Sequence, residues 1–158
     1  MSIGVFDSGI GGLTVLKEAL RLLPGEDYLY YADTKHVPYG TKPKDEVRGY
    51  IFDAADFFEG KGVEALVVAC NTATSIAIND LRERYSFPII GMEPAVKAAV
   101  EKVDSRRVLV LATPITVREK KLHDLVERLD SEDIVDLHAL PGLVEFAEKF
   151  VFDEDTVI

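Results

Sequence analysis

The sequence predicts an α/β protein built on a parallel β-sheet. Short apolar runs alternate with longer segments in which apolar residues recur every three or four positions, and these patterns are typical of buried strands and amphipathic helices. Turn-forming residues such as Pro24-Gly25 separate the segments. Strands that alternate with helices form βαβ units, in which helices cover the faces of a parallel sheet.

The first strands and the first helix are predicted from composition and spacing. Residues 2–6 are a short apolar run and residues 27–32 are rich in tyrosine, so both are expected to be strands. Residues 13–23 carry an apolar stripe that ends at Pro24-Gly25, which predicts a helix between these strands.

The following elements continue the alternation. Residues 44–61 predict a second helix, because apolar residues recur along one of its faces. The residues expected to be buried there are Val47, Ile51, Ala54, Phe57 and Phe58. The mostly apolar run at 63–69 predicts a buried strand, followed by a helix at 72–85 and a short strand at 88–91.

A second α/β series begins near Glu93-Pro94. Its expected elements are helices at 94–103, 115–129 and 143–150 and strands at 107–112 and 134–139. The sequence therefore predicts a first α/β domain at 1–93 and the start of a second, incomplete one at 94–158.

Composition narrows the classes of protein. With 158 residues and 47% hydrophobic residues the chain is long enough for a packed core. Its single cysteine excludes an internal disulfide and favours a reducing compartment. No basic leader and no apolar run near ~18 residues is present, so a soluble cytoplasmic protein without membrane contact is expected. The net charge of −10 argues against nucleic-acid binding, because little positive charge is left to neutralise phosphates.

Small polar groups follow four of the predicted strands. Ligands of open parallel sheets bind beyond the carboxyl ends of the strands, so these groups are candidate site residues. They lie in Asp7-Ser8-Gly9-Ile10-Gly11-Gly12, in Asp33 with Pro38-Tyr39-Gly40, in Cys70-Asn71-Thr72, and in Thr113-Pro114-Ile115-Thr116. Hydroxyl, amide and carboxylate groups of this kind suit a small zwitterionic ligand.

Cys70 lies where a buried strand is expected to turn into a helix. Unpaired N–H groups and the helix dipole at such a place lower a thiol pKa from its usual ~8.5, which makes the sulfur a base or nucleophile at neutral pH. A lone cysteine in an apolar run is also typical of an inert core residue. An aspartate nearby, Asp7, opposes the thiolate by charge repulsion. A carboxylate beside a thiol favours proton transfer over acyl transfer, which would require a histidine.

The glycine turn at residues 9–12 has a structural explanation as well as a functional one. It has neither the spacing of a dinucleotide-binding fingerprint nor the lysine of a phosphate-binding loop. Asp7 and Ser8 before it are also compatible with helix capping. No cluster of histidine, cysteine and carboxylate has metal-ligand spacing, so no metal is expected. The histidines are expected to be structural or solvated: His36, His123 and His138.

Three segments together resemble the glutamate racemases, the cofactor-independent isomerases that supply D-glutamate for bacterial peptidoglycan. These segments are residues 4–15 (GVFDSGIGGLTV), 31–40 (YADTKHVPYG) and 69–74 (ACNTAT). They occur in the order and spacing of that family, and the resemblance weakens after about Thr116. It implies two similar α/β domains that face each other across a cleft, the first completed by a later part of the chain.

The resemblance also implies roles for individual residues. Inverting Cα without a cofactor requires a base on one side of the substrate and an acid on the other, and both are cysteines in this family. Cys70 corresponds to one of them, with Asp7 assisting its proton transfers. The residues implied to line the glutamate site are Ser8, Pro38, Tyr39, Gly40, Asn71, Thr72 and Thr116. Glu148 corresponds to a glutamate on the side of the second cysteine.

The second catalytic cysteine of the family, in a Gly-Cys-Thr-His segment, has no counterpart in this sequence. The sequence is therefore expected to be either the N-terminal part of a longer racemase, inactive alone, or a natural short form. A related racemase or isomerase acting on aspartate, a hydantoin or maleate is an alternative. A non-catalytic amino-acid-binding module is another alternative. A homodimer is a possible oligomeric state.

Overall fold

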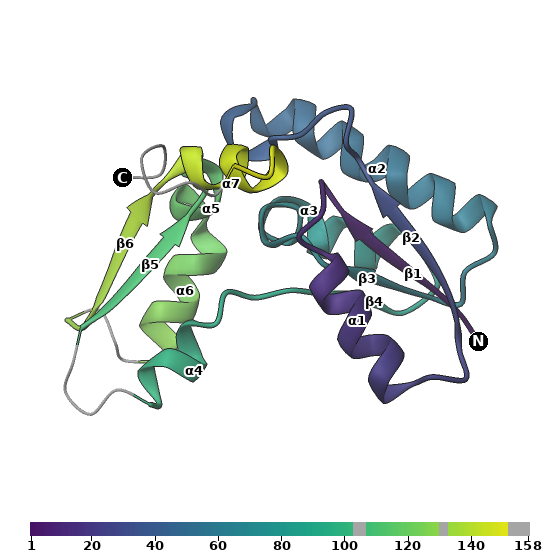
Figure 1. Cartoon of the computed structure of the whole chain (residues 1–158), viewed down its shortest axis with the longest axis horizontal. Helices are drawn as coiled ribbons and strands as arrows, with labels where there is room; N and C mark the ends of the chain where they lie inside the picture. The colour runs from purple at the N-terminus through teal and green to yellow at the C-terminus, as the bar shows by residue number, and fades with distance from the viewer. Residues whose placement is uncertain (103–106, 130–132, 152–158) are drawn as a thin grey trace. The chain divides into compact units, whose positions relative to one another are not determined.

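The computed structural model describes residues 1–102, 107–129 and 133–151. The chain divides into two compact units, Met1–Met92 and Glu93–Ile158. Each unit alternates strands with helices, as the sequence predicts (Figure 1).

The first unit is built on a four-stranded parallel sheet with the strand order β2-β1-β3-β4. Its strands are β1 (Ser2–Asp7), β2 (Asp27–Ala32), β3 (Ala65–Val68) and β4 (Ile89–Gly91). The central strand β1 pairs with β2 on one side and with β3 on the other, so Val5 lies between Tyr30 and Val67. All four strands therefore end at the same edge of the sheet.

Helices cover both faces of this sheet (Figure 1). They are α1 (Leu13–Leu22), α2 (Lys44–Gly60) and α3 (Asn71–Arg84), with a short 3-10 helix, η1 (Tyr39–Thr41), before α2. Val15 and Leu16 of α1 pack against Ile3 and Val5 on one face. On the other face, Gly4 lies so close to Phe58 of α2 that a Cβ there would be 2.7 Å from that ring.

One residue predicted to be buried on α2 is partly exposed. Phe57 has a relative exposure of 37%, whereas Ala55 is buried in its place. The ring of Phe57 instead lies at the border of the core, 5.2 Å from the ring of Tyr31 and beneath the ammonium group of Lys61. The buried face of α2 is centred on Val47, Ile51 and Phe58 and also includes Ala54 and Ala55.

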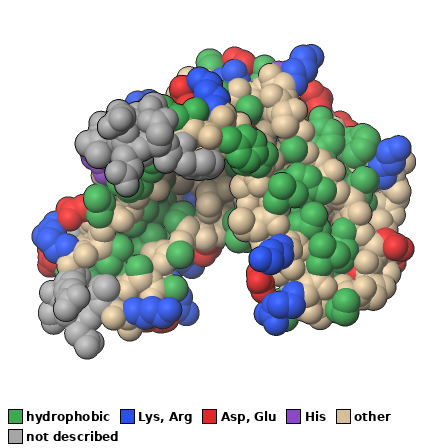
Figure 2. Space-filling view, in the orientation of Figure 1, with side chains coloured by type: hydrophobic (Ala, Val, Ile, Leu, Met, Phe, Trp, Pro, Cys, Tyr) green, Lys and Arg blue, Asp and Glu red, His purple; other side chains and the backbone are tan. Residues whose placement is uncertain are grey.

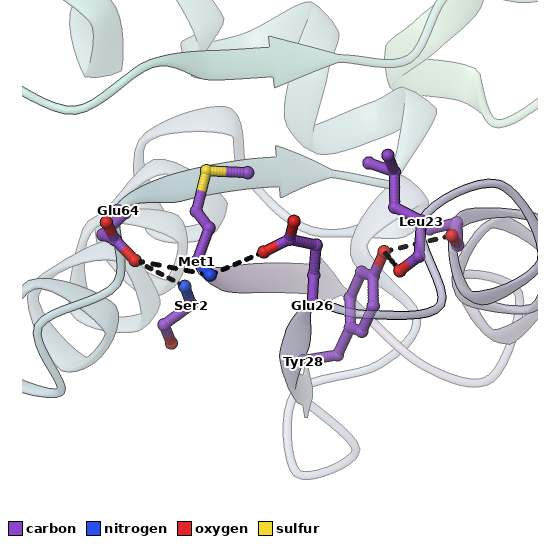
Figure 3. A network of polar contacts seen from close by, with 7 residues as sticks. Met1, Ser2, Leu23, Glu26, Tyr28 and Glu64 are labelled. Carbon is purple, nitrogen blue, oxygen red and sulfur yellow. Dashed lines mark hydrogen bonds and ion pairs between the residues drawn. The ribbon is translucent and has the colours of Figure 1, made fainter.

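Polar contacts hold together the edge of the sheet at which its strands begin (Figure 3). The N-terminal ammonium group forms an ion pair with Glu26, and the backbone N–H of Ser2 donates to Glu64 at 2.7 Å. The hydroxyl of Tyr28 donates to the carbonyl oxygens of Ala19 and Leu23 at the end of α1. The start of β1 is thereby tied to the segments that precede β2 and β3.

The last residue of the first unit is tied to its core. The backbone N–H of Met92 lies 3.1 Å from the carbonyl oxygen of Val68 and 3.0 Å from the hydroxyl oxygen of Thr74. Thr74 is fully buried on α3, and its own hydroxyl lies 3.3 Å from the Val68 carbonyl oxygen. The chain therefore leaves the first unit from a point fixed to both β3 and α3.

The second unit contains a parallel pair of strands, β5 (Val108–Ala112) and β6 (Val135–Ala139). Its helices are α4 (Val96–Val100), α5 (Pro114–Arg118), α6 (Lys120–Arg128) and α7 (Pro141–Glu148). Its core consists of Val96, Leu122, Leu125, Val126 and Val135. The helix predicted at 94–103 is shorter, and its predicted end at Val103 lies outside the described residues.

The single helix predicted at 115–129 is wrong, because two helices occupy this segment. Glu119 has an extended backbone with ψ 133°, which ends α5 and begins α6. This bend lets Leu122, Leu125 and Val126 of α6 face the core of the second unit.

Apolar side chains remain exposed on both units. On the first unit they include Leu13, Leu20, Leu22, Leu23 and Ile90, and hydrophobic side chains are visible on its surface in Figure 2. On the second unit, Leu109 and Leu111 of β5 are 62% and 46% exposed, whereas their neighbours Val108 and Val110 pack into the core. One face of each unit is thus only partly covered by the described residues. None of their helices is long and apolar enough to cross a membrane.

A pair of glycine substitutions tests the packing of the first unit. Gly4→Ala forces a Cβ against the buried Phe58 and Leu66 side chains, and we expect it to destabilise this unit by about 1–3 kcal/mol. Gly49→Ala lies in α2 with no atom within 4 Å, so we expect it to stabilise by about 0.4–1 kcal/mol. The sequence has six tyrosines, all in the first unit, and no tryptophan, so tyrosine fluorescence during urea unfolding measures this unit alone. Equal effects of both substitutions would contradict the packing described for Gly4.

Candidate functional site

The parallel pairing of β1 and β3 brings two of the predicted motifs together. Phe6 pairs with Val68, and the N–H of Ala69 donates to the carbonyl oxygen of Phe6 at 2.7 Å. Asp7 and Ser8 follow β1, and Cys70 follows β3 at the same edge of the sheet. As a result, the Oγ of Ser8 lies 3.6 Å from the Sγ of Cys70, within hydrogen-bond distance for a sulfur atom.

Cys70 is the N-cap residue of α3. Its backbone is extended, and its sulfur accepts a hydrogen bond of 3.4 Å from the N–H of Ala73. The thiol thus satisfies one of the backbone donors that the first turn of a helix leaves unpaired. Cys70 is 7% exposed, so the sulfur lies just beneath the surface at the strand edge.

The environment of Cys70 raises its pKa, which differs from the low thiol pKa predicted from the sequence. Burial is the largest cause, because it disfavours the charged thiolate, and the negative charge of Asp7 adds to it. Hydrogen bonding to the Ala73 backbone and to the hydroxyl and backbone of Ser8 lowers the pKa by less. In this structure the group is therefore a neutral thiol at neutral pH.

Asp7 is held by the glycine turn that follows it. It is 6% exposed, and its Oδ2 accepts a hydrogen bond of 2.9 Å from the N–H of Gly9. Gly12 packs against Asp7 and Ala69: a Cβ at position 12 would lie 2.6 Å from the Cβ of Asp7 and 3.1 Å from the Cβ of Ala69. Steric crowding therefore explains why position 12 is a glycine, since only a residue without a side chain lets α1 begin so close to Asp7.

A second buried carboxylate, Asp33, organises the Pro38-Tyr39-Gly40 segment. Its Oδ2 accepts a hydrogen bond of 2.6 Å from the hydroxyl of Tyr39, and the Nδ1 of His36 lies 2.8 Å from its Oδ1. His36 stacks on the ring of Tyr50, with centroids 3.9 Å apart and an interplanar angle of 7°. His36 is thus held by Asp33 and by the ring of Tyr50.

Tyr39 lies close to the start of α3. It is 2% exposed, and η1 contacts α3. Burial, the hydrogen bond to Asp33 and the charges of Asp33 and Cys70 raise the pKa of Tyr39 well above its usual value, so its hydroxyl stays protonated. The sequence predicts that Asp33 lies at the carboxyl edge of the sheet. It does not predict the hydrogen bond between Asp33 and Tyr39, because this contact joins residues of an irregular loop.

The remaining predicted site residues differ in their surroundings. In the first unit, Thr72 and Gly40 are buried, Pro38 is half-buried and Asn71 is exposed at the start of α3. In the second unit, Thr116 is buried, with its hydroxyl 3.0 Å from that of Thr113, which caps α5. Glu148 is the last residue of α7 and is half-buried. The other two histidines are exposed: His123 contacts the Val117 carbonyl oxygen, and His138 lies on β6.

Within the described ranges, no group of three or more histidine, cysteine and carboxylate side chains is arranged to hold a metal ion. The strand-edge site is instead a buried thiol with a hydroxyl in contact and a carboxylate close enough to influence its proton. A thiol, a hydroxyl and a carboxylate at one strand edge are groups that can exchange protons.

Comparison with known proteins identifies the family. Residues 4–156 match the family described as Asp/Glu/Hydantoin racemase, and the chain belongs to this family. It is 70% identical over 158 residues to a glutamate racemase of Halothermothrix orenii and 60% identical over 160 residues to glutamate racemase 2 of Bacillus subtilis. These matches include the whole chain but only 62% and 60% of the two relatives, so the chain spans about three fifths of their length.

Solved structures of glutamate racemases share the fold. The one from Campylobacter jejuni has a TM-score of 0.88 and 34% identity, covering 99% of this chain and 64% of that one. The Escherichia coli enzyme, solved with L-glutamate and the activator UDP-MurNAc-ala, has a TM-score of 0.84 and 33% identity over 92% of this chain and 55% of that one. The Francisella tularensis enzyme, solved with D-glutamate, has a TM-score of 0.81 and 33% identity over 98% and 59%.

The charge of Asp7 is expected to control the titration of Cys70. Because a negative charge disfavours the thiolate, Asp7→Asn removes one cause of the raised pKa and moves the midpoint of the thiol titration to lower pH. Asparagine keeps an oxygen that can accept the Gly9 N–H. The midpoint is measured from the rate of iodoacetamide alkylation as a function of pH, since the sequence has one cysteine.

The control is Asp27→Asn, because Asp27 is exposed at the beginning of β2, the opposite end of the strand from the edge at which Asp7 and Cys70 lie. We expect its alkylation profile to match that of the unmodified chain. An unchanged midpoint in Asp7→Asn would show that Asp7 does not act on the thiol.

The hydrogen bond between Tyr39 and Asp33 is expected to stabilise the first unit. Tyr39→Phe removes a buried hydroxyl that donates to a carboxylate, and we expect a loss of about 1–3 kcal/mol. Tyr50→Phe is the matched control, because its hydroxyl donates to the exposed Glu46 and its loss is expected to cost less than about 1 kcal/mol. Urea unfolding followed by fluorescence of the remaining tyrosines compares the two, and a larger loss for Tyr50→Phe would contradict this assignment.

Proposed function

We propose that this chain is the N-terminal part of a glutamate racemase and supplies one of the two proton-transfer groups of its active site, Cys70. The observation that carries the proposal is the buried thiol at the edge of the sheet, in contact with Ser8 and within the field of Asp7. The reaction is the inversion of L-glutamate to D-glutamate for peptidoglycan synthesis. It needs no cofactor, as the family resemblance implies.

The raised pKa of Cys70 suits one half of this reaction. A protonated thiol can deliver its proton to the carbanion at Cα from one side, which leaves a thiolate. In the opposite direction the thiolate removes the Cα proton and returns to the thiol. Asp7 assists by accepting or returning the thiol proton when the site is reset, because its carboxylate lies buried at the same strand edge.

The polar groups around Cys70 provide contacts for a zwitterionic amino acid. The hydroxyl of Ser8 and the first turn of α3, at Asn71 and Thr72, are placed to receive a carboxylate, since a helix N-terminus favours negative charge. The Pro38-Tyr39-Gly40 segment, fixed by Asp33, forms another wall of the site. In the second unit we assign Thr116 to the substrate site and Glu148 to the side of the second cysteine.

Glutamate is favoured over other substrates of the same family. The family description also includes aspartate and hydantoin racemases. Four curated relatives with 70%, 60%, 56% and 51% identity are named as glutamate racemases, and two related structures contain L-glutamate or D-glutamate.

The exposed apolar faces support an assembly with further polypeptide. Leu20 and Leu22 on α1 and Leu109 and Leu111 on β5 remain uncovered, although helices usually cover both faces of a parallel sheet. About two fifths of the length of these relatives lies outside the part that matches this chain. We propose that residues 94–158 begin the second domain and that the remaining part supplies the second cysteine. The enzyme is expected in the cytoplasm, where a free thiol persists.

The proposal predicts that the 158-residue chain binds glutamate without racemising it. Proton NMR in heavy water follows the α-proton of L-glutamate or D-glutamate, and polarimetry follows inversion. We expect no inversion with this chain, because its single thiol can serve only one side of Cα. Exchange with inversion that disappears in Cys70→Ser would mean that the chain builds a two-base site by itself, for example as a homodimer.

A chimera provides the positive arm of the experiment. The chain is joined to the part of the Halothermothrix orenii racemase that lies beyond the match. We expect the chimera to exchange the α-proton and invert both enantiomers, and Cys70→Ser in the chimera to abolish inversion. An active Cys70→Ser chimera would disprove the catalytic role of Cys70.

A non-catalytic amino-acid-binding module is the second candidate, and the single cysteine favours it. Calorimetry separates the two functions. Tight glutamate binding by the 158-residue chain, together with an inactive chimera that binds equally well, would support a binding module.

A further inference from the structure

We propose that Tyr30 is a positioning residue whose hydroxyl holds the turn at Ser8 and Gly9 against the thiol of Cys70. The proposal uses the proposed function only in taking Cys70 as the reacting group. It assigns a role to a residue of β2 that is separated from the motifs around Asp7 and Cys70 in the sequence.

Tyr30 is placed by the pairing of the edge strand β2 with β1. It is paired with Val5 of β1, and its ring packs against the core formed by Ile3, Val5 and Ala69. From there its hydroxyl reaches the edge of the sheet and donates a hydrogen bond of 2.9 Å to the carbonyl oxygen of Gly9. The Tyr30 side chain, which packs in the core, thus holds the backbone of the turn at Gly9 by a hydrogen bond.

The absence of a side chain at Gly12 makes this contact possible. A Cβ at position 12 would lie 2.9 Å from the hydroxyl oxygen of Tyr30, closer than real Cβ contacts. The same Cβ would also approach Asp7 and Ala69. Gly12 therefore leaves room for the Tyr30 hydroxyl beside the carboxylate and the strand that precedes Cys70.

The backbone of Gly9 is held at both of its polar groups. Its N–H donates to the Oδ2 of Asp7 at 2.9 Å, and its carbonyl oxygen accepts from Tyr30. Ser8 immediately precedes it and contacts the Cys70 sulfur through its Oγ at 3.6 Å. Hydrogen bonding from Ser8, by hydroxyl and backbone, lowers the pKa of Cys70 against the effect of burial. Fixing Gly9 therefore keeps Ser8 where it can support the thiolate.

Tyr30→Phe tests the proposal, because it removes only the hydroxyl. We expect the midpoint of the pH profile for alkylation of Cys70 by iodoacetamide to move to higher pH. At a fixed pH below the midpoint the rate is expected to fall roughly twofold to tenfold, the range that one hydrogen bond provides. The measurement uses the complete 158-residue chain, and near-UV circular dichroism confirms that each variant is folded.

Tyr28→Phe is the matched control. Tyr28 lies two residues earlier on the same face of β2, and its hydroxyl also donates to backbone carbonyl oxygens, at Ala19 and Leu23 (Figure 3). These atoms lie at the far end of α1 from the site, so we expect an unchanged midpoint. An unchanged midpoint in Tyr30→Phe, or an equal shift in both variants, would overturn the proposal.

A double-mutant cycle with Ser8→Ala keeps the test decisive if Tyr30→Phe also loosens the fold. If Tyr30 acts through Ser8, Tyr30→Phe shifts the midpoint less in the Ser8→Ala background than in the unmodified chain. Additive shifts would overturn the proposal. The alkylation experiment does not depend on racemase activity. An unchanged midpoint in Tyr30→Phe would therefore overturn the role of Tyr30 but not the proposed function. An active Cys70→Ser chimera would overturn the proposed function but not the role of Tyr30 in positioning Ser8.

Discussion

The parallel pairing of β1 with β3 is the constraint on which the candidate site depends. Side chains that follow these two strands are separated by about sixty positions in the sequence, yet the hydrogen bond from Ala69 to Phe6 sets them side by side. Only this register places Ser8 beside the sulfur of Cys70. The glycine turn and the cap of α3 then complete the site with backbone groups, so most of its geometry comes from the main chain.

The thiol sits in a balance of opposing influences. Burial and a nearby carboxylate favour the neutral form of Cys70, and three hydrogen-bond donors favour the thiolate less strongly. The proposed racemisation requires this thiol to give a proton in one direction and its thiolate to take one in the other. Substrate groups that bring positive charge toward the sulfur would shift the balance toward the thiolate, and Ser8 and Ala73 are already in position to support it.

The sequence predicted the order and type of the strands and helices because hydrophobic periodicity and turn residues agree along most of the chain. It also predicted the edge at which Cys70 and Asp7 meet, since parallel strands end together. The bend at Glu119 was missed because no glycine or proline marks it, and the exposure of Phe57 because a helical pattern does not show where the core ends. The direction of the pKa shift at Cys70 required the depth of burial, which a sequence does not contain.

The attachment of Met92 has a consequence for the candidate site. Its N–H is held by Val68 and by Thr74, one turn along the helix that Cys70 caps. The chain therefore leaves the first unit from a point held by the same strand and helix that position Cys70. The thiol, the glycine turn and the start of α3 all lie within Met1–Met92, so their mutual distances depend on the first unit alone. The geometry of the candidate site is thus a property of one compact unit, whatever follows it in the chain.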